Sequence, residues 1–207
     1  MTLISLLDYA SVLVFAITGA LVASRAQLDL VGFGFIACLT ALGGGTVRDL
    51  LLDRNPIFWI ANPAYLAVGT LAALVVFFTA HLLESRYRTL IWLDSFALAV
   101  AVAAGAGVAM SLDQTPTIVI LMGMITGCMG GLMRDVVVGE VPLVLKQGEL
   151  YVTAAFAGSL TAVIIRSFLN DETIALFAGA CVAWVLRAGS LYFGWNLPVY
   201  KSRPPRA

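Results

Sequence analysis

Long stretches without a single charged residue run through this sequence, and they limit the folds open to it. Seven such runs occur, at 9–24, 30–47, 55–83, 95–112, 114–133, 150–165 and 173–186. A transmembrane helix needs about 20 mostly apolar residues to cross roughly 30 Å of hydrocarbon, and each run reaches that length with its flanks. The runs are apolar on every face, whereas barrel strands alternate polar and apolar residues. We therefore predict an all-α integral membrane protein with seven transmembrane helices.

The overall composition excludes several classes of protein. Hydrophobic residues make up 61% of the chain and charged residues 12%, whereas soluble domains carry about 25% charged residues. That is too little charge for the surface of a cytosolic enzyme, a disordered chain or a disulfide-rich secreted domain. The formal net charge is zero, so nothing indicates a nucleic-acid partner.

The first six predicted helices form an internal repeat with an offset of 86 residues. Hydrophobic similarity alone would not align residue types that are rare in this chain. The aligned pairs include Asp8 with Asp94, Thr40 with Thr126, Gly44-Gly45 with Gly130-Gly131, Arg48-Asp49 with Arg134-Asp135, Pro56 with Pro142 and Tyr65 with Tyr151. Self-similarity at a fixed offset indicates a duplicated structural unit.

Each repeat holds three membrane spans, so the second repeat enters the membrane from the opposite face. We predict a first three-helix repeat at 1–86, an inverted second repeat at 87–172, a seventh helix at 173–196 and a basic cytoplasmic tail at 197–207. In inverted-repeat transporters the ion or substrate site lies near the membrane midplane, on interrupted helices.

Glycines occur at matching places in the second and fifth spans, which read TALGGGTVRD from Thr40 and TGCMGGLMRD from Thr126. Each glycine weakens a helix interior by about 1 kcal/mol relative to alanine, so the cluster predicts helices broken at Gly43–Gly45 and Gly130–Gly131. Backbone unwound in lipid must face protein or water, which indicates a polar pathway. The alternative is that these glycines form packing faces, and both roles are compatible.

A broken helix would expose carbonyl oxygens that bind a partly dehydrated cation. We expect K⁺ or Na⁺ to pass transiently at carbonyls near Leu42, Gly43, Cys128 and Met129, with no structural metal site. The predicted pathway residues are Thr40, Gly43, Gly44, Gly45, Arg48, Asp49, Thr126, Gly130, Gly131, Arg134 and Asp135.

Charged residues inside the membrane are costly and usually functional. Arg48-Asp49 and Arg134-Asp135 either lock the fold as ion pairs or act directly in ion attraction and gating. By topology Asp8 shares a membrane face with Arg48, and Asp94 shares one with Arg134. These two aspartates are therefore the candidate ion-pair partners.

Basic residues in the loops predict the orientation, because they concentrate on the cytoplasmic side. With Arg48 and Arg134 set aside as intramembrane, the N-terminal side holds Arg54 and Arg166. The other side holds Arg25, Arg86, Arg88, Lys146, Arg187, Lys201, Arg203 and Arg206. The N-terminus is expected outside and the C-terminus in the cytoplasm.

Signals of other chemistry are weak in this chain. Cys38, Cys128 and Cys181 lie within apolar runs and lack metal-ligand spacing, and His81 is the only histidine. Walker, nucleophile-elbow and HExxH sequences do not occur, so we expect no enzyme activity and no cofactor. A lipid bound by the basic tail is the weaker alternative to a role of that tail in topology alone.

The duplicated GGxxRD motif, the two three-helix repeats and the lone seventh helix resemble the trimeric intracellular cation (TRIC) channel family. The likeness is greatest to its prokaryotic branch, which is also catalogued as a glycine transporter. This resemblance implies a homotrimer with one hourglass pore per protomer, kinked at Gly43–Gly45 and Gly130–Gly131, that passes potassium. One departure is Met129, which stands where the first repeat has Gly43.

We therefore expect a potassium-permeable monovalent cation channel in the prokaryotic inner membrane, with itself and membrane lipids as partners. Two alternatives remain at this point. One is a secondary transporter of a small amino acid such as glycine, and the other is a structural membrane subunit. The sequence has no TVGYG filter, which argues against strong selectivity for K⁺ over Na⁺.

Overall fold

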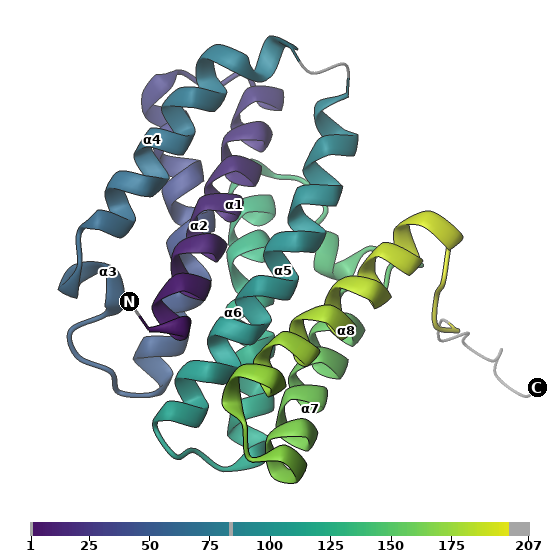
Figure 1. The fold of residues 1–207 in the computed structure, drawn as a ribbon. Coiled ribbons are helices and arrows are strands. Elements are labelled where there is room, and N and C mark those ends of the chain that lie inside the picture. Colours follow the sequence, from purple (N-terminus) through teal and green to yellow (C-terminus); the bar gives the residue numbers. More distant parts are fainter. Residues whose placement is uncertain (1, 83–84, 199–207) are drawn as a thin grey trace, which may run out of the picture.

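The computed structural model describes residues 2–82 and 85–198. Seven helices in this part of the chain are long and apolar enough to cross a membrane, as predicted. They are α1 (Leu3–Arg25), α2 (Leu30–Leu51), α4 (Ala64–Thr79, continued by η1 to Leu82), α5 (Arg86–Ser111), α6 (Pro116–Val138), α7 (Tyr151–Leu169) and α8 (Glu172–Phe193) (Figure 1). Short helical turns lie between them: α3 (Phe58–Ala61), η1 (Ala80–Leu82) and η2 (Leu143–Leu145).

The starts of three helices follow the capping signals of the sequence. The Asn62 side chain accepts a hydrogen bond from the Ala64 amide at the start of α4, and Pro116 is the first residue of α6. Asp171 accepts from the Ile174 amide at the start of α8. Each device satisfies or removes an amide that would otherwise lack a partner in the first turn.

The helices are arranged as two inverted three-helix repeats with α8 added on one side. Helices α1, α2 and α4 form the first repeat, and α5, α6 and α7 form the second. The repeats meet where α1 packs against α5 and where α2 packs against α6. Helix α8 lies obliquely across the second repeat, in contact with α7 and α5 (Figure 1).

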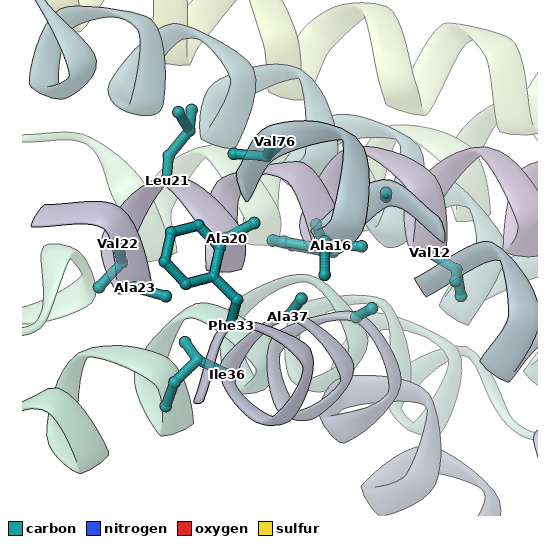
Figure 2. Close-up of a cluster of buried hydrophobic side chains, with 14 of the residues drawn as sticks. Val12, Ala16, Ala20, Leu21, Val22, Ala23, Phe33, Ile36, Ala37 and Val76 are labelled. Atoms are coloured by element: carbon teal, nitrogen blue, oxygen red, sulfur yellow. The ribbon is translucent and has the colours of Figure 1, made fainter. Parts of the chain in front are cut away.

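Small side chains bring the central helices close together. Figure 2 shows Ala16 and Ala20 of α1 against Phe33 and Ala37 of α2. Helices in lipid associate largely through close van der Waals packing, and small residues permit this packing. In α5 the run from Ala97 to Ala109 is buried almost throughout, so α5 is the central helix of the bundle.

The predicted interruption of the second and fifth spans is wrong. Both α2 and α6 are α-helical from end to end, and their ranges include Gly43–Gly45 and Gly130–Gly131. The cost of glycine in these helices is offset by tertiary packing, because the glycines let the two backbones touch. In this conformation the glycines therefore serve helix packing, which was the alternative to a helix break in the sequence analysis.

Candidate ion pathway

The crossing of α2 and α6 is built from two reciprocal contacts between a glycine and a carbonyl. A Cβ atom at Gly44 would overlap with the backbone oxygen of Thr126, and one at Gly130 would overlap with the backbone oxygen of Thr40. These four residues pair in the repeat, Thr40 with Thr126 and Gly44 with Gly130. The crossing therefore lies on the pseudo-two-fold axis, where a site shared by both repeats is expected.

The carbonyl cation site expected near Leu42, Gly43, Cys128 and Met129 is not formed. Because α2 and α6 are continuous, these carbonyls lie within helices and are not freed as ligands. Gly43 instead leaves room for the Met133 side chain, whose sulfur would be 2.8 Å from a Cβ at that position. Met133 thus comes to lie beside Gly43 at the crossing.

Threonine hydroxyls lie beside the crossing, that of Thr40 against Gly19 of α1 and that of Thr126 against Gly105 of α5. The hydroxyl of Thr40 donates to the Ile36 carbonyl at 2.6 Å, and that of Thr126 donates to the Met122 carbonyl at 2.7 Å. Both threonines are buried. A hydroxyl that donates within its own helix keeps lone pairs free, so each oxygen can still accept a hydrogen bond or contact a cation.

Arg48 forms a buried ion network in the first repeat. Its Nη1 donates to Asp8 Oδ1 at 2.9 Å and its Nε donates to Asp49 Oδ1 at 2.8 Å. The Arg48 and Asp49 side chains are fully buried, and that of Asp8 is 8% exposed. The partner assigned to Arg48 by topology is thus the one it contacts.

Arg134 repeats this network in the second half of the chain. Its Nη1 donates to Asp94 Oδ1 at 2.8 Å and its Nε donates to Asp135 Oδ1 at 2.7 Å. Arg134 also donates to the Thr18 hydroxyl at 3.1 Å. The first repeat lacks that bond because residue 104, the counterpart of Thr18, is alanine.

The two aspartates of the motifs also fix the chain that follows each helix. Asp49 Oδ2 accepts from the Phe58 amide at the start of α3, and Asp135 Oδ2 accepts from the Leu143 amide at the start of η2, both at 2.9 Å. Asp49 and Asp135 therefore cap the short helices that follow α2 and α6. Each carboxylate links an arginine, its own helix and the next turn.

A polar vestibule opens at the end of the bundle where α1 begins. It has a volume of about 590 Å³ and is lined by residues such as Asp8, Tyr9, Arg54, Asn62 and Tyr65. Two charged members of the network face this vestibule: Asp8, and Arg54, whose guanidinium is 40% exposed and lies 3.4 Å from Asp49 Oδ1. Arg48 behind Asp8 is fully buried. A cation that passes Asp8 would therefore encounter its carboxylate before the Arg48 guanidinium.

A narrow cavity continues from Asp8 toward the helix crossing. Asp8, Thr40, Gly44 and Thr126 are among its lining residues, and its volume is about 10 Å³. That volume accommodates roughly one water molecule. The vestibule and the crossing are thus connected by a polar neck that is too small for a hydrated ion in this conformation.

Several residues of these networks did not stand out in the sequence. Arg187 counted there as a loop residue, but its side chain is fully buried on α8, where it contacts Glu149 and stacks on Tyr151. Arg187 directly follows the uncharged run at 173–186, and this position was a signal that its charge lies within the membrane. Thr18 carried no such signal. The basic tail residues Lys201, Arg203 and Arg206 lie outside the described residues.

Comparison with known families gives a match over both repeats. The model of a family described as glycine transporter matches residues 5–81 and again residues 91–167. The two matches begin 86 residues apart, the offset of the repeat. Helix α8 lies outside both matches.

Relatives and solved structures cover nearly the whole chain. A UPF0126 membrane protein of Vibrio cholerae is 34% identical over 96% of this chain and 83% of its own. The UPF0126 inner membrane protein YadS of Escherichia coli is 34% identical over 94% of each chain. The TRIC trimeric intracellular cation channel orthologue from Rhodobacter sphaeroides is 41% identical, with a TM-score of 0.90 over 94% of this chain and 100% of that one. A second TRIC cation channel structure is 30% identical, with a TM-score of 0.86 over 98% of this chain and 100% of that one.

Proposed function

Because the chain belongs to the family of the bacterial TRIC channels and UPF0126 membrane proteins, we propose that it is a potassium-permeable monovalent cation channel. Each protomer contains its own pathway, which runs from the vestibule at Asp8 to the crossing of α2 and α6. The proteins similar to it include a trimeric intracellular cation channel, which supports assembly as a homotrimer.

The observation that carries this proposal is the polar vestibule and the neck that leads from it to the crossing. Polar groups at this depth in a membrane protein mark a route for ions or substrate, because they are costly elsewhere. Asp8 attracts cations at the inner end of the vestibule, beside the stacked rings of Tyr9 and Tyr65. At the crossing, the hydroxyls of Thr40 and Thr126 replace part of the hydration shell.

Conduction requires a small separation of α2 and α6. The Gly44 and Gly130 contacts hold the two backbones together in this conformation, and the neck holds roughly one water molecule. The pathway lacks the ring of carbonyl oxygens that gives potassium channels their selectivity. We therefore infer that Na⁺ passes as well as K⁺.

We infer from the basic loops that the vestibule lies on the outer face of the inner membrane. An E. coli relative is named an inner membrane protein, and the positive-inside rule puts the α1–α2 and α6–α7 connections in the cytoplasm. The N-terminus then lies outside and the C-terminus in the cytoplasm. Cations would enter the vestibule from outside.

Recording from purified protein in planar bilayers tests the proposal. Under a KCl gradient we expect unitary currents that reverse near the K⁺ equilibrium potential and persist when Na⁺ replaces K⁺. Native mass spectrometry from mild detergent should show three copies of the chain. Uptake of labelled glycine into liposomes is the parallel measurement. Saturable glycine uptake without cation current would contradict the channel and favour a transporter.

A further inference from the structure

Arg187 of α8 is a buried cation that the repeat does not explain. Its side chain is fully buried, and its Nη2 donates to Glu149 Oε2 at 2.5 Å. The guanidinium lies over the Tyr151 ring, 4.9 Å from the ring centroid. Its Nε and Nη1 have no hydrogen-bond partner within the described part of the chain. Only one of the three guanidinium nitrogens has a hydrogen-bond partner among the described residues, which is few for a buried charge.

Comparison of the two repeats shows which residue Arg187 replaces. Tyr151 is the counterpart of Tyr65, which lines the vestibule and stacks on Tyr9 with 4.0 Å between the ring centroids. The counterpart of Tyr9 is Ser95, which has no ring to cover Tyr151. Arg187 takes that role, so α8 covers in the second repeat the surface that faces the open vestibule in the first.

Behind Arg187 lies a group of polar atoms without partners. A Cβ atom at Gly131 would be 3.1 Å from the Tyr151 hydroxyl, 3.6 Å from Asp94 Oδ1 and 3.7 Å from Arg134 Nη2. Among the described residues, the Tyr151 hydroxyl, Asp94 Oδ2 and Arg134 Nη2 make no hydrogen bond. Buried polar groups are normally satisfied by protein or water, so this cluster is suited to hydration.

We propose that Arg187, locked by Glu149, is the gate of the inner half of the pathway, an inference that rests on the proposed channel function. With Arg187 on Tyr151, the route from the crossing past Asp94 to the cytoplasm is closed. When Arg187 leaves Tyr151, water reaches Asp94 and completes the second half of the route.

The lock is accessible from the cytoplasmic side. The Glu149 side chain is 22% exposed whereas that of Arg187 is 0% exposed. Glu149 lies in the connection between η2 and α7, so a change in that connection bears directly on the arginine. Helix α8 has no counterpart in the repeats, so the second repeat carries a closing element that the first lacks.

Thiol modification tests the gate without relying on ion current. Cys128 of α6 packs in the same buried cluster as Tyr151 and is 8% exposed. It becomes the only thiol in a background with Cys38→Ala and Cys181→Ala. In nanodiscs, we expect Arg187→Gln and Glu149→Gln to raise the rate at which a cationic methanethiosulfonate modifies Cys128 by about tenfold, because breaking a charge-assisted hydrogen bond shifts an opening equilibrium by at least that factor.

Arg25→Gln is the matched control. Arg25 pairs with Glu140 at the same end of the bundle, at 3.1 Å, but both side chains are about one-third exposed and lie outside the cluster around Tyr151. We expect no change in Cys128 modification in this variant. An equal rise in the control would reveal general loosening and would overturn the gate.

Ion flux into liposomes gives the second readout. Arg187→Gln and Glu149→Gln should raise cation flux per folded protomer several-fold. Unchanged Cys128 rates in both folded variants would overturn the gate, whether or not the wild-type protein conducts. If Arg187→Gln does not fold, Glu149→Gln decides alone, since glutamine keeps an oxygen that can accept a hydrogen bond from Arg187 and only the charge is lost. Absence of wild-type current combined with faster Cys128 modification would contradict the channel function and leave the closing role of Arg187 intact.

Discussion

Gly44 of α2 lies directly against the backbone carbonyl of Thr126 on α6, so closely that a Cβ atom at Gly44 would overlap with that oxygen. The inverted repeat places Gly130 against the carbonyl of Thr40 in the same way. Contacts of this kind between a glycine Cα–H and a carbonyl recur at close helix crossings and add weak attraction. The two contacts fix the distance between the helices that carry both ion networks.

Alanine at either glycine should therefore force the helices apart. We expect Gly44→Ala and Gly130→Ala to lower the stability of the folded protein by about 1–3 kcal/mol, the usual cost of overpacking. The same displacement should change cation flux per folded protomer, because it moves Thr40 and Thr126. Thermal unfolding in detergent and flux in liposomes measure the two effects.

Gly34→Ala is the matched control for this prediction. Gly34 lies on the same helix, and a Cβ atom there would meet nothing within 4 Å. Because alanine favours a helix over glycine by about 1 kcal/mol, this variant should be as stable as the wild type or more stable. Wild-type stability in Gly44→Ala as well would contradict the tight crossing.

Neutralising Asp49 or Asp135 should mainly weaken the fold. Asp49 binds both the Arg48 guanidinium and the Phe58 amide, and Asp135 binds Arg134 and the Leu143 amide. Removing one partner of a buried ion pair costs about 3–5 kcal/mol. We expect Asp49→Ala and Asp135→Ala to lower the unfolding temperature markedly.

Asp53→Asn controls for the loss of an acidic charge close to Asp49. The Asp53 side chain is exposed and bonds only to Asn55 among the described residues, and asparagine tolerates the left-handed backbone at this position (φ 50°), so the unfolding temperature should hardly change. If Asp49→Ala unfolds like the wild type but conducts poorly, the carboxylate acts in the pathway and not in the fold.

The sequence predicted the framework of the molecule because rare residue types carry a strong signal. Uncharged runs predicted the seven spans, and the topology of these spans made Asp8 the candidate partner of Arg48 and Asp94 that of Arg134, as the structure shows. These inferences hold because a charge in lipid needs a partner and only a few are available.

The state of the glycine helices could not be predicted in the same way. Glycine weakens a helix by propensity, yet it also allows close packing, and only the position of the partner helix decides between the two. The structure places a carbonyl against Gly44 and Gly130, which favours continuous helices. Arg187 was misplaced for a related reason, since its burial depends on Tyr151 and Ser95, far from it in the sequence.

Thr18 makes the two ion networks unequal, and this difference is testable. Its hydroxyl accepts from Arg134 Nη1 at 3.1 Å, whereas its counterpart in the other repeat is Ala104, which has no hydroxyl to offer Arg48. A hydrogen bond to a charged group contributes about 1.5–3 kcal/mol. We expect Thr18→Val to lower the free energy of unfolding by that amount, while Thr18→Ser retains the hydroxyl and most of the stability. Equal losses in the two variants would mean that the methyl group and not the hydroxyl matters.

Asp8 should control how readily cations enter the pathway from the vestibule. Its carboxylate lies between the vestibule and the buried Arg48, so Asp8→Asn removes one of the two negative charges that balance Arg48 and shifts the local charge toward positive. Like charges a few ångströms apart at a partly hydrated site repel by about 1–4 kcal/mol, which corresponds to roughly a tenfold fall in cation flux or more. Asp113→Asn is the matched control, because Asp113 is exposed at the same end of the bundle and does not line the vestibule. Flux per folded protomer into liposomes should fall only for Asp8→Asn, and the fall should shrink at high salt as screening weakens the repulsion. Equal flux in the two variants would show that ions do not pass Asp8.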